Sequence, residues 1–170
     1  MEKKWVVAGI IGILLIVSIP LLNQKKGWSE PSQPPCYTPV PPTLLEENLM
    51  SVKKAQEKIP YKIIEPKYLP TNFRLLGVYV GKEKVMLLYE DSKGRRITIS
   101  ERKDNGYEHQ PHPREKEVTI NETTGWFVVL GPYGLLWNCD GLIIFLSADL
   151  SGGEDAVMDE MIKIAESMQC

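Results

Sequence analysis

The stretch GLLWNCDGLIIF, residues 134–145, decides the predicted fold because it has the pattern of a β-hairpin. Two apolar runs, 135–138 and 142–148, flank a short turn that contains Asp140 and Gly141. An Asp-Gly pair between two strand-forming runs is a strong signal for a tight antiparallel turn. The end of the chain is therefore predicted to hold two paired antiparallel strands.

Further strand-like runs precede this hairpin, and most are separated by turns that contain Gly, Asn or Asp. Their residue ranges are 73–81, 84–90, 95–101, 117–121 and 125–131. Sequential strands with short turns favour an antiparallel meander, here of about six to seven strands. No helical segment lies between the strands, which excludes a doubly wound parallel sheet.

Two amphipathic segments flank the strands and predict two helices. Residues 43–60 begin with Thr43 and Glu46, which have the spacing of a capping box, and they end at Pro60. Residues 154–168 place apolar side chains at helical spacing on one face. One sheet with a helix at each end predicts an α+β fold, in which each helix covers an apolar face of the sheet.

The first 42 residues predict a membrane anchor and a spacer. Residues 5–22 are 18 positions without a charge, and as a helix they span roughly 27 Å, close to the thickness of a hydrocarbon core. No A-x-A site follows this run, so an uncleaved anchor is preferred to a cleaved signal peptide. Residues 23–42 include six prolines and favour a stiff, extended linker.

The predicted organisation has four parts, which are a cytoplasmic stub (1–4), the anchor (5–22), the Pro-rich linker (23–42) and an α+β domain (43–170). Lysines flank the span almost equally on both sides, so the positive-inside rule alone does not orient it. We expect a single-pass protein of the cell membrane with its C-terminal domain outside the cytoplasm.

The charge pattern argues against nucleic acid as a partner. The chain has 20 Lys and Arg against 22 Asp and Glu, and residues 43–170 have 16 against 20, a net charge of −4. The densest basic cluster along the sequence is Lys93, Arg95 and Arg96. A nucleic-acid interface needs a concentrated positive face, which the sequence does not indicate.

Three short motifs resemble those of a known family. They comprise Pro66, Tyr68, Leu69, Pro70 and Phe73 before the strands, Leu135, Trp137 and Gly141 in the hairpin, and Ile164, Ala165 and Ser167 in the last helix. On these motifs, residues 64–168 resemble the domain of unknown function 4367 family. Two positions depart from the family pattern. Asn72 stands where the family has Gly, and Ile144-Phe145 stands near the place of a family Tyr.

This resemblance implies an extracytoplasmic domain that stands beyond a membrane helix, often in proteins that resemble anti-sigma regulators. It supports placing residues 23–170 outside the cytoplasm. It does not carry the regulatory activity across, because an anti-sigma protein needs a cytosolic domain to hold its partner. Only residues 1–4 precede the predicted span.

His109 and His112 are the only histidines and form an H-x-x-H pair that suggests two metal ligands. Prolines flank His112, so this is a loop rather than a metalloprotease helix, and the nearest third ligands are Glu108 and Glu115. No metal or other cofactor is predicted. A nucleophilic Cys139 is also disfavoured, because the neighbouring carboxylate of Asp140 raises rather than lowers a thiol pKa.

The aromatic residues of the strands offer the binding hypothesis that the composition allows. If the sheet curls, Tyr79, Tyr89, Trp126 and Trp137 line a groove for an apolar ligand such as a lipid or a peptide. The prediction is therefore a membrane-anchored extracytoplasmic binding or sensing module without catalytic activity. The alternatives are a membrane-tethered, metal-dependent hydrolase that uses the His109 and His112 loop, and a scaffold that binds another envelope protein along a sheet edge.

Two covalent features are predicted for the domain. Asn121-Glu122-Thr123 is an N-glycosylation sequon in a turn between two strands. Cys139 and Cys170 are predicted to form a disulfide, because a helix over 154–168 that returns along the last strand brings Cys170 beside the hairpin turn. This pairing leaves Cys36 unpaired in the linker, and the alternative is three reduced thiols.

Overall fold

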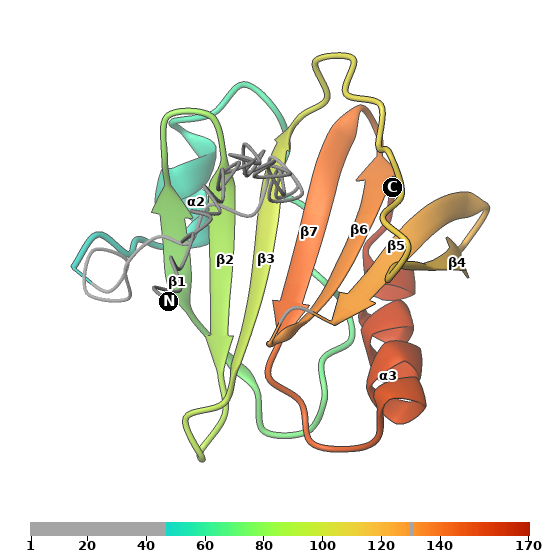
Figure 1. Ribbon diagram of the computed structural model, residues 1–170. Coiled ribbons are helices and arrows are strands. Elements are labelled where there is room, and N and C mark those ends of the chain that lie inside the picture. Colours follow the sequence, from blue (N-terminus) through green and yellow to red (C-terminus); the bar gives the residue numbers. More distant parts are fainter. Residues whose placement is uncertain (1–46, 130) are drawn as a thin grey trace, which may run out of the picture. The chain divides into compact units, whose positions relative to one another are not determined.

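The structure is a computed structural model that describes residues 47–129 and 131–170 (Figure 1). The predicted stub, anchor and linker lie outside the described residues, as do Thr43 and Glu46 of the predicted capping box. In the part of the chain that is described, no helix is both long enough and apolar enough to cross a bilayer.

A seven-stranded antiparallel sheet forms the centre of the domain, as the strand pattern predicts. Its strands are β1 (Arg74–Val80), β2 (Val85–Glu90), β3 (Arg96–Lys103), β4 (Lys116–Ile120), β5 (Thr123–Val129), β6 (Tyr133–Cys139) and β7 (Leu142–Ala148). The β6–β7 turn holds Asp140 and Gly141 at φ 48° and 72°, the left-handed conformation that a tight hairpin turn requires.

The single meander predicted from the sequence is wrong in one connection. The strand order is β1-β2-β3-β7-β6-β5-β4, so the sheet consists of two meanders joined where β3 pairs with β7 (Figure 1). That pairing runs from Ile97 opposite Ala148 to Lys103 opposite Leu142. Almost every residue of β7 is buried, so this strand is accommodated best at the centre of the sheet, with a neighbour on each side.

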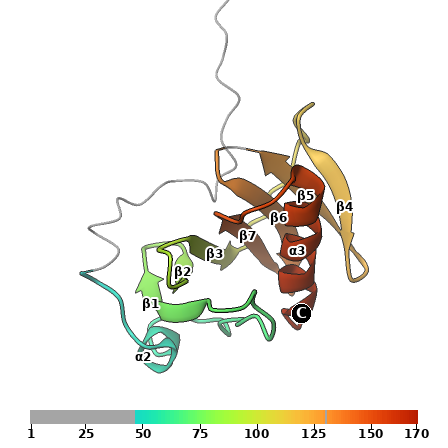
Figure 2. The same ribbon diagram turned by 90° about the horizontal axis from the view of Figure 1, so that it is seen from below.

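The predicted C-terminal helix is present as α3 (Glu154–Ser167). Its buried residues Val157, Met161, Ile164 and Ala165 face the sheet, which gives one continuous apolar layer. Figure 2 shows α3 against the half of the sheet that runs from β7 to β4, with these strands curling around it. The curl produces a convex and a concave side, and α3 occupies the concave one.

The N-terminal helix is much shorter than predicted. It is α2 (Val52–Gln56), and Ser51 caps it by accepting a hydrogen bond from the Lys54 amide. Met50, which lies within the predicted helix, is extended rather than helical, because its N–H and C=O both form hydrogen bonds with Val78 at the edge of β1. The backbone of Met50 therefore satisfies its hydrogen bonds in the sheet rather than in a helix.

The larger apolar layer lies between the sheet and the two helices. Residues of α2, α3 and all seven strands share it, so both helices cover the same face (Figure 2). The opposite face carries two smaller clusters. One contains Leu136, Ile143 and Phe145 with Tyr107 and Trp126, and the other contains Met86 and Leu88 with Leu49, Leu76 and Tyr79. Each helix therefore covers an apolar face as predicted, and the two helices share the same face.

Candidate functional site: an aromatic groove opposite the helices

An open groove of about 510 Å³ lies on the face opposite α3, over β4, β5 and β6. It is lined by Tyr107, His109, Glu117, Thr123, Thr124, Trp126, Leu136, Trp137 and Asn138. The register of the strands explains its floor, since Glu117 is opposite Trp126 and Trp126 is opposite Leu136. Side chains opposite one another in adjacent strands share a face, so these three form a continuous surface.

The loop between β3 and β4, residues 104–115, bounds one side of the groove. Asp104 fixes its start: its amide donates to the Gly141 carbonyl, and its Oδ1 accepts from the amides of Gly106 and Tyr107. Asn138 on β6 also donates to the Asp104 carboxylate at 3.4 Å. These contacts tie the loop to the β6–β7 hairpin.

Glu115 fixes the other end of the loop. One oxygen of its carboxylate lies 2.7 Å from His109 Nε2 and 2.8 Å from the amide nitrogen of His112. His109 Nδ1 lies 3.2 Å from the Tyr107 hydroxyl, and the His109 ring lies against Trp126 with 5.2 Å between centroids. The side chains of His109 and Glu115 are only 13% and 7% exposed, so this cluster is part of the packed structure.

This arrangement does not bring the two histidines together as ligands. Both nitrogens of His109 already face Glu115 and Tyr107, while Nδ1 of His112 accepts from the Arg114 amide. Within residues 47–129 and 131–170, no group of three or more His, Cys, Asp or Glu side chains is arranged to hold a metal ion. The observed role of His109 is to pack on Trp126.

The four aromatic residues named from the sequence do not gather at one place. Trp126 lies in the groove, half-buried. Trp137 borders it, but its side chain is 1% exposed and belongs to the helix-side core, as does Tyr89. Tyr79 is on the same face as Trp126 but packs with Met86 and Leu88 near β1. Of these four residues, Trp126 alone presents its ring to the groove.

Sequence reasoning missed most of the groove's other residues. Leu136 and Asn138 alternate with Trp137 along β6, so their position on the opposite face follows once Trp137 is known to be in the core. No comparable sequence pattern predicts the position of Tyr107, because that position depends on how the 104–115 loop returns over β5.

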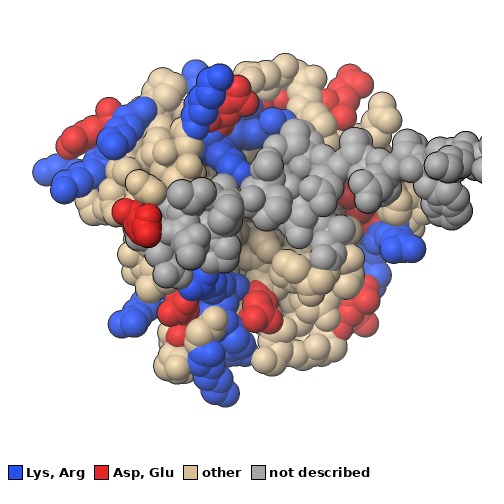
Figure 3. All heavy atoms as spheres, turned by 60° about the vertical axis from the view of Figure 1, so that its left-hand side comes forward, with Lys and Arg blue, Asp and Glu red and all other residues tan. Residues whose placement is uncertain are grey.

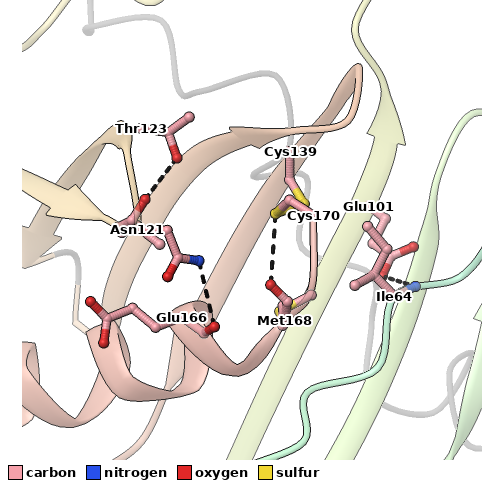
Figure 4. The surroundings of a disulfide bond; sticks show 9 residues. Ile64, Glu101, Asn121, Thr123, Cys139, Glu166, Met168 and Cys170 are labelled. Carbon is pink, nitrogen blue, oxygen red and sulfur yellow. Dashed lines mark hydrogen bonds between the residues drawn. A yellow bond between two sulfur atoms is a disulfide. The ribbon is translucent and has the colours of Figure 1, made fainter.

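A buried carboxyl is a second unpredicted feature, on the helix-covered face. Glu101 is 0% exposed, and its Oε1 accepts a hydrogen bond of 3.0 Å from the Ile64 amide (Figure 4). Removal from water raises the pKa of Glu101 to about 8, and the nearby charge of Glu65 contributes in the same direction. Ile97 and Ile99 precede Glu101 by four and two residues in β3 and therefore share its face of the sheet. This spacing was a sequence signal for the burial of Glu101.

The structure joins Cys139 to Cys170 by a disulfide, in agreement with the prediction (Figure 4). The two Cα atoms are 5.2 Å apart, and Cys139 is 3% exposed. The pairing ties the last residue of the chain to the hairpin end of β6. Cys36 lies outside the described residues.

Asn121 is exposed in the two-residue turn between β4 and β5, at φ 51°. Its Nδ2 lies 3.5 Å from the Glu166 carbonyl, and Thr123 donates its hydroxyl to the Ile120 carbonyl (Figure 4). The sequon is therefore on the surface, and its glycosylation stays a prediction.

The first and the last of the three sequence motifs, around Tyr68 and Ser167, are in contact in the structure. The Tyr68 amide donates to the Ser167 hydroxyl at 3.1 Å, and the Tyr68 hydroxyl donates to Glu160 of α3. Ser167 in turn donates to the Ile164 carbonyl at 2.7 Å. The segment before β1 is thereby fastened along α3, so these motif residues have a structural role.

The fold is that of an α+β domain with helices on one face of an antiparallel sheet and an open groove on the other. Residues 63–168 match the family described as domain of unknown function (DUF4367), and the chain belongs to that family. This confirms the resemblance seen in the sequence motifs. Searches of curated proteins and of solved structures find no match.

Proposed function

We propose that this protein is a membrane-anchored binding module whose domain, residues 43–170, lies outside the cytoplasm and holds a peptide in the groove over Trp126. The observation that carries the proposal is the open groove of about 510 Å³, with Trp126 in its floor and polar side chains beside it. Ligand sites are typically concave, mostly apolar and bordered by a few polar groups that fix orientation.

A peptide fits the lining of this groove better than a lipid chain. Trp126 and Tyr107, which are both half-buried, offer apolar ring surface for one or two side chains. Thr124, Asn138 and Glu117 stand beside them with donors and acceptors that suit backbone amides. An acyl chain leaves those polar groups without partners, which costs free energy on desolvation.

The placement outside the cytoplasm draws support from two features. The uncharged run at residues 5–22 has the length of a membrane span. The Cys139–Cys170 disulfide belongs to an oxidising compartment, since cytosolic thiols are kept reduced.

The proposal of binding without catalysis rests on the state of the reactive side chains. Cys139 and Cys170 are joined to each other, so neither offers a thiolate. His109 is held between Glu115 and Tyr107, and the Tyr107 hydroxyl is the group that a general base would activate there. Among the described residues, His109 therefore has no serine or cysteine nucleophile as a hydrogen-bond partner.

A peptide selection with matched variants tests this function. The full chain, in a neutral detergent, is used to select from a phage-displayed library of random peptides, and affinities of enriched peptides are measured by fluorescence anisotropy. Trp126→Ala is expected to weaken binding roughly tenfold or more, because an aromatic anchor in an apolar pocket is a typical hot spot. Tyr79→Ala is the control, since Tyr79 is an aromatic residue on the same face but outside the groove.

Three results contradict the proposal. They are no enrichment over an unrelated detergent-solubilised protein, equal losses in the two variants, or binding that is unaffected by Trp126→Ala. Native mass spectrometry tests whether the ligand is a lipid instead. A lipid that co-purifies with the parent protein but not with Trp126→Ala, together with no peptide enrichment, would show that the groove binds a lipid rather than a peptide.

A further inference from the structure

A second cavity, of about 250 Å³, lies at the end of the sheet where β1 meets β2. Three segments distant in sequence build it: residues 58–61 after α2, the turn 81–84, and residues 102–105 at the end of β3. Its lining residues are Lys58, Ile59, Pro60, Tyr61, Gly81, Lys82, Glu83, Lys84, Arg102, Lys103 and Asn105. We call it the cationic cleft.

The charge of the cationic cleft is opposite to that of the domain. Its lining includes five cations, Lys58, Lys82, Lys84, Arg102 and Lys103, and one acid, Glu83. Residues 43–170 carry 16 basic against 20 acidic side chains. Figure 3 views the molecule from the β1 side and shows one group of Lys and Arg side chains at its upper end and another at its lower end, each with acidic side chains nearby. The fold therefore concentrates cations that are scattered along the sequence.

Most of this positive charge is available to a ligand. Lys58, Lys82 and Lys103 are exposed, and none of the ion pairs found in residues 47–129 and 131–170 involves them. The Arg102 guanidinium lies over the Tyr107 ring at 5.5 Å. Its Nε is buried without a hydrogen-bond partner in the described structure, so one of its donors is unsatisfied.

Nearby carboxyl groups do not neutralise the cleft. Asp104 directs its oxygens to the amides of Gly106 and Tyr107 and to the side chain of Asn138. Glu101 is buried on the helix-covered face, where desolvation raises its pKa to about 8 and keeps it mainly neutral at pH 7. Neither of these two carboxyl groups lines the cleft, in which Glu83 is the one acid beside five cations.

We infer that the cationic cleft binds a phosphate group, either on a lipid headgroup or on a free phosphate compound. Clustered like charges repel one another, and this repulsion costs free energy unless a counter-ion of opposite charge binds among them. A carboxylate supplies one negative charge and two oxygens. A phosphate supplies more oxygens around one centre, which suits cations that converge from three segments. This site is separate from the Trp126 groove, so it does not depend on the proposed peptide function.

Isothermal titration calorimetry on the full chain in a neutral detergent tests the inference with two probes. Inorganic pyrophosphate represents a free phosphate compound, and sn-glycero-3-phosphoglycerol represents a phosphodiester headgroup without acyl chains. We expect saturable binding to one site, weakened by added salt because the attraction is electrostatic. Binding of both probes assigns recognition to the phosphate itself, and binding of the phosphodiester alone assigns it to a headgroup.

Two double variants with equal charge changes separate the cleft from the net charge. Lys82→Gln with Lys103→Gln is expected to weaken binding roughly tenfold or more, since it removes two of the five cations that attract the phosphate. Lys67→Gln with Lys93→Gln removes two exposed lysines outside the cleft and is expected to retain affinity within about twofold. Absence of saturable binding for both probes, or equal losses in the two double variants, overturns the inference.

Discussion

Glu101 and Trp137 lie in one cross-strand row on the helix-covered face of the sheet, with Ile144 between them. Each side chain has a buried polar atom, Oε2 and Nε1 respectively, without a hydrogen-bond partner in the described structure. The apolar layer thus contains a carboxyl group that has only the Ile64 amide to stabilise its charge. Such a group favours its neutral form, and folding stability then depends on pH.

The domain is expected to lose stability as pH rises from about 4.5 to about 8 because of Glu101. Between its ordinary pKa of 4.5 and the folded pKa of about 8, the folded state retains a proton that the unfolded state releases. The contribution is therefore fully present below the ordinary value and lost on approaching pH 8, by on the order of a few kcal/mol. Urea unfolding at pH 5 and pH 8 measures it.

Glu101→Gln is the matched variant for this pH dependence, because an amide retains an acceptor for the Ile64 amide but does not ionise. It is expected to match the parent protein at pH 5 and to be more stable than it at pH 8. An equal pH dependence in the two proteins would show that Glu101 titrates normally.

Cys170→Ser is expected to lower the free energy of unfolding by about 3–4 kcal/mol, as the loss of a cross-link across 31 residues of separation predicts in the chain-entropy model. Cys36→Ser, which leaves this bridge intact, is the control and is expected to leave stability unchanged. Non-reducing peptide mapping identifies the pair directly. A free thiol at Cys170, or a Cys36–Cys139 peptide, is the result that contradicts the assignment.

Asn121 is expected to carry a glycan when the protein is secreted by a host with N-glycosylation, because it is exposed in a turn and the sequon is intact. Glycosidase treatment should shift the parent protein on a gel and leave Asn121→Gln unshifted. Protease shaving of intact cells gives an independent measure of placement. A domain untouched by shaving argues against its location outside the cytoplasm.

Glu115→Ala is expected to loosen the 104–115 loop, because its carboxylate holds both the His109 ring and the His112 amide. Loss of these charge-assisted contacts should cost about 1–3 kcal/mol and speed amide exchange at His112. Glu108→Ala is the control, since Glu108 is an exposed acid of the same loop that shares none of these contacts. Equal rates of amide exchange at His112 in the two variants would show that Glu115 does not hold the loop.

The sequence predicts best those features that depend on neighbouring residues. The hairpin around Asp140 and Gly141 and the apolar stripe of α3 are local patterns, and both are present. The Cys139–Cys170 pair follows from these two elements, because the lengths of the last strand and of α3 determine that Cys170 returns to the hairpin turn. In contrast, the β3–β7 pairing depends on long-range competition between strand edges, which no local pattern records.

The helix start shows why a local signal can mislead. Residues 43–60 have an amphipathic pattern, yet among the described residues the helix begins only after Ser51, which caps it. The backbone of Met50 pairs with Val78 at the free edge of β1, and a short helix does not offset the loss of two such bonds. The groove has the same kind of limit: strand alternation places Trp126 and Leu136 on one face, but only the folded loop adds Tyr107 and His109.

The β3–β7 pairing determines when this domain is able to assemble during synthesis. The chain is made from its N-terminus, so the first meander, β1 to β3, exists before its central neighbour has been made. The edge of β3 stays unpaired until Leu142–Ala148 has emerged, and α3 follows later still. An open strand edge is a site for pairing with other chains. The sheet is therefore complete only after all seven strands have been made, and truncated chains that stop before Leu142 are exposed to aggregation.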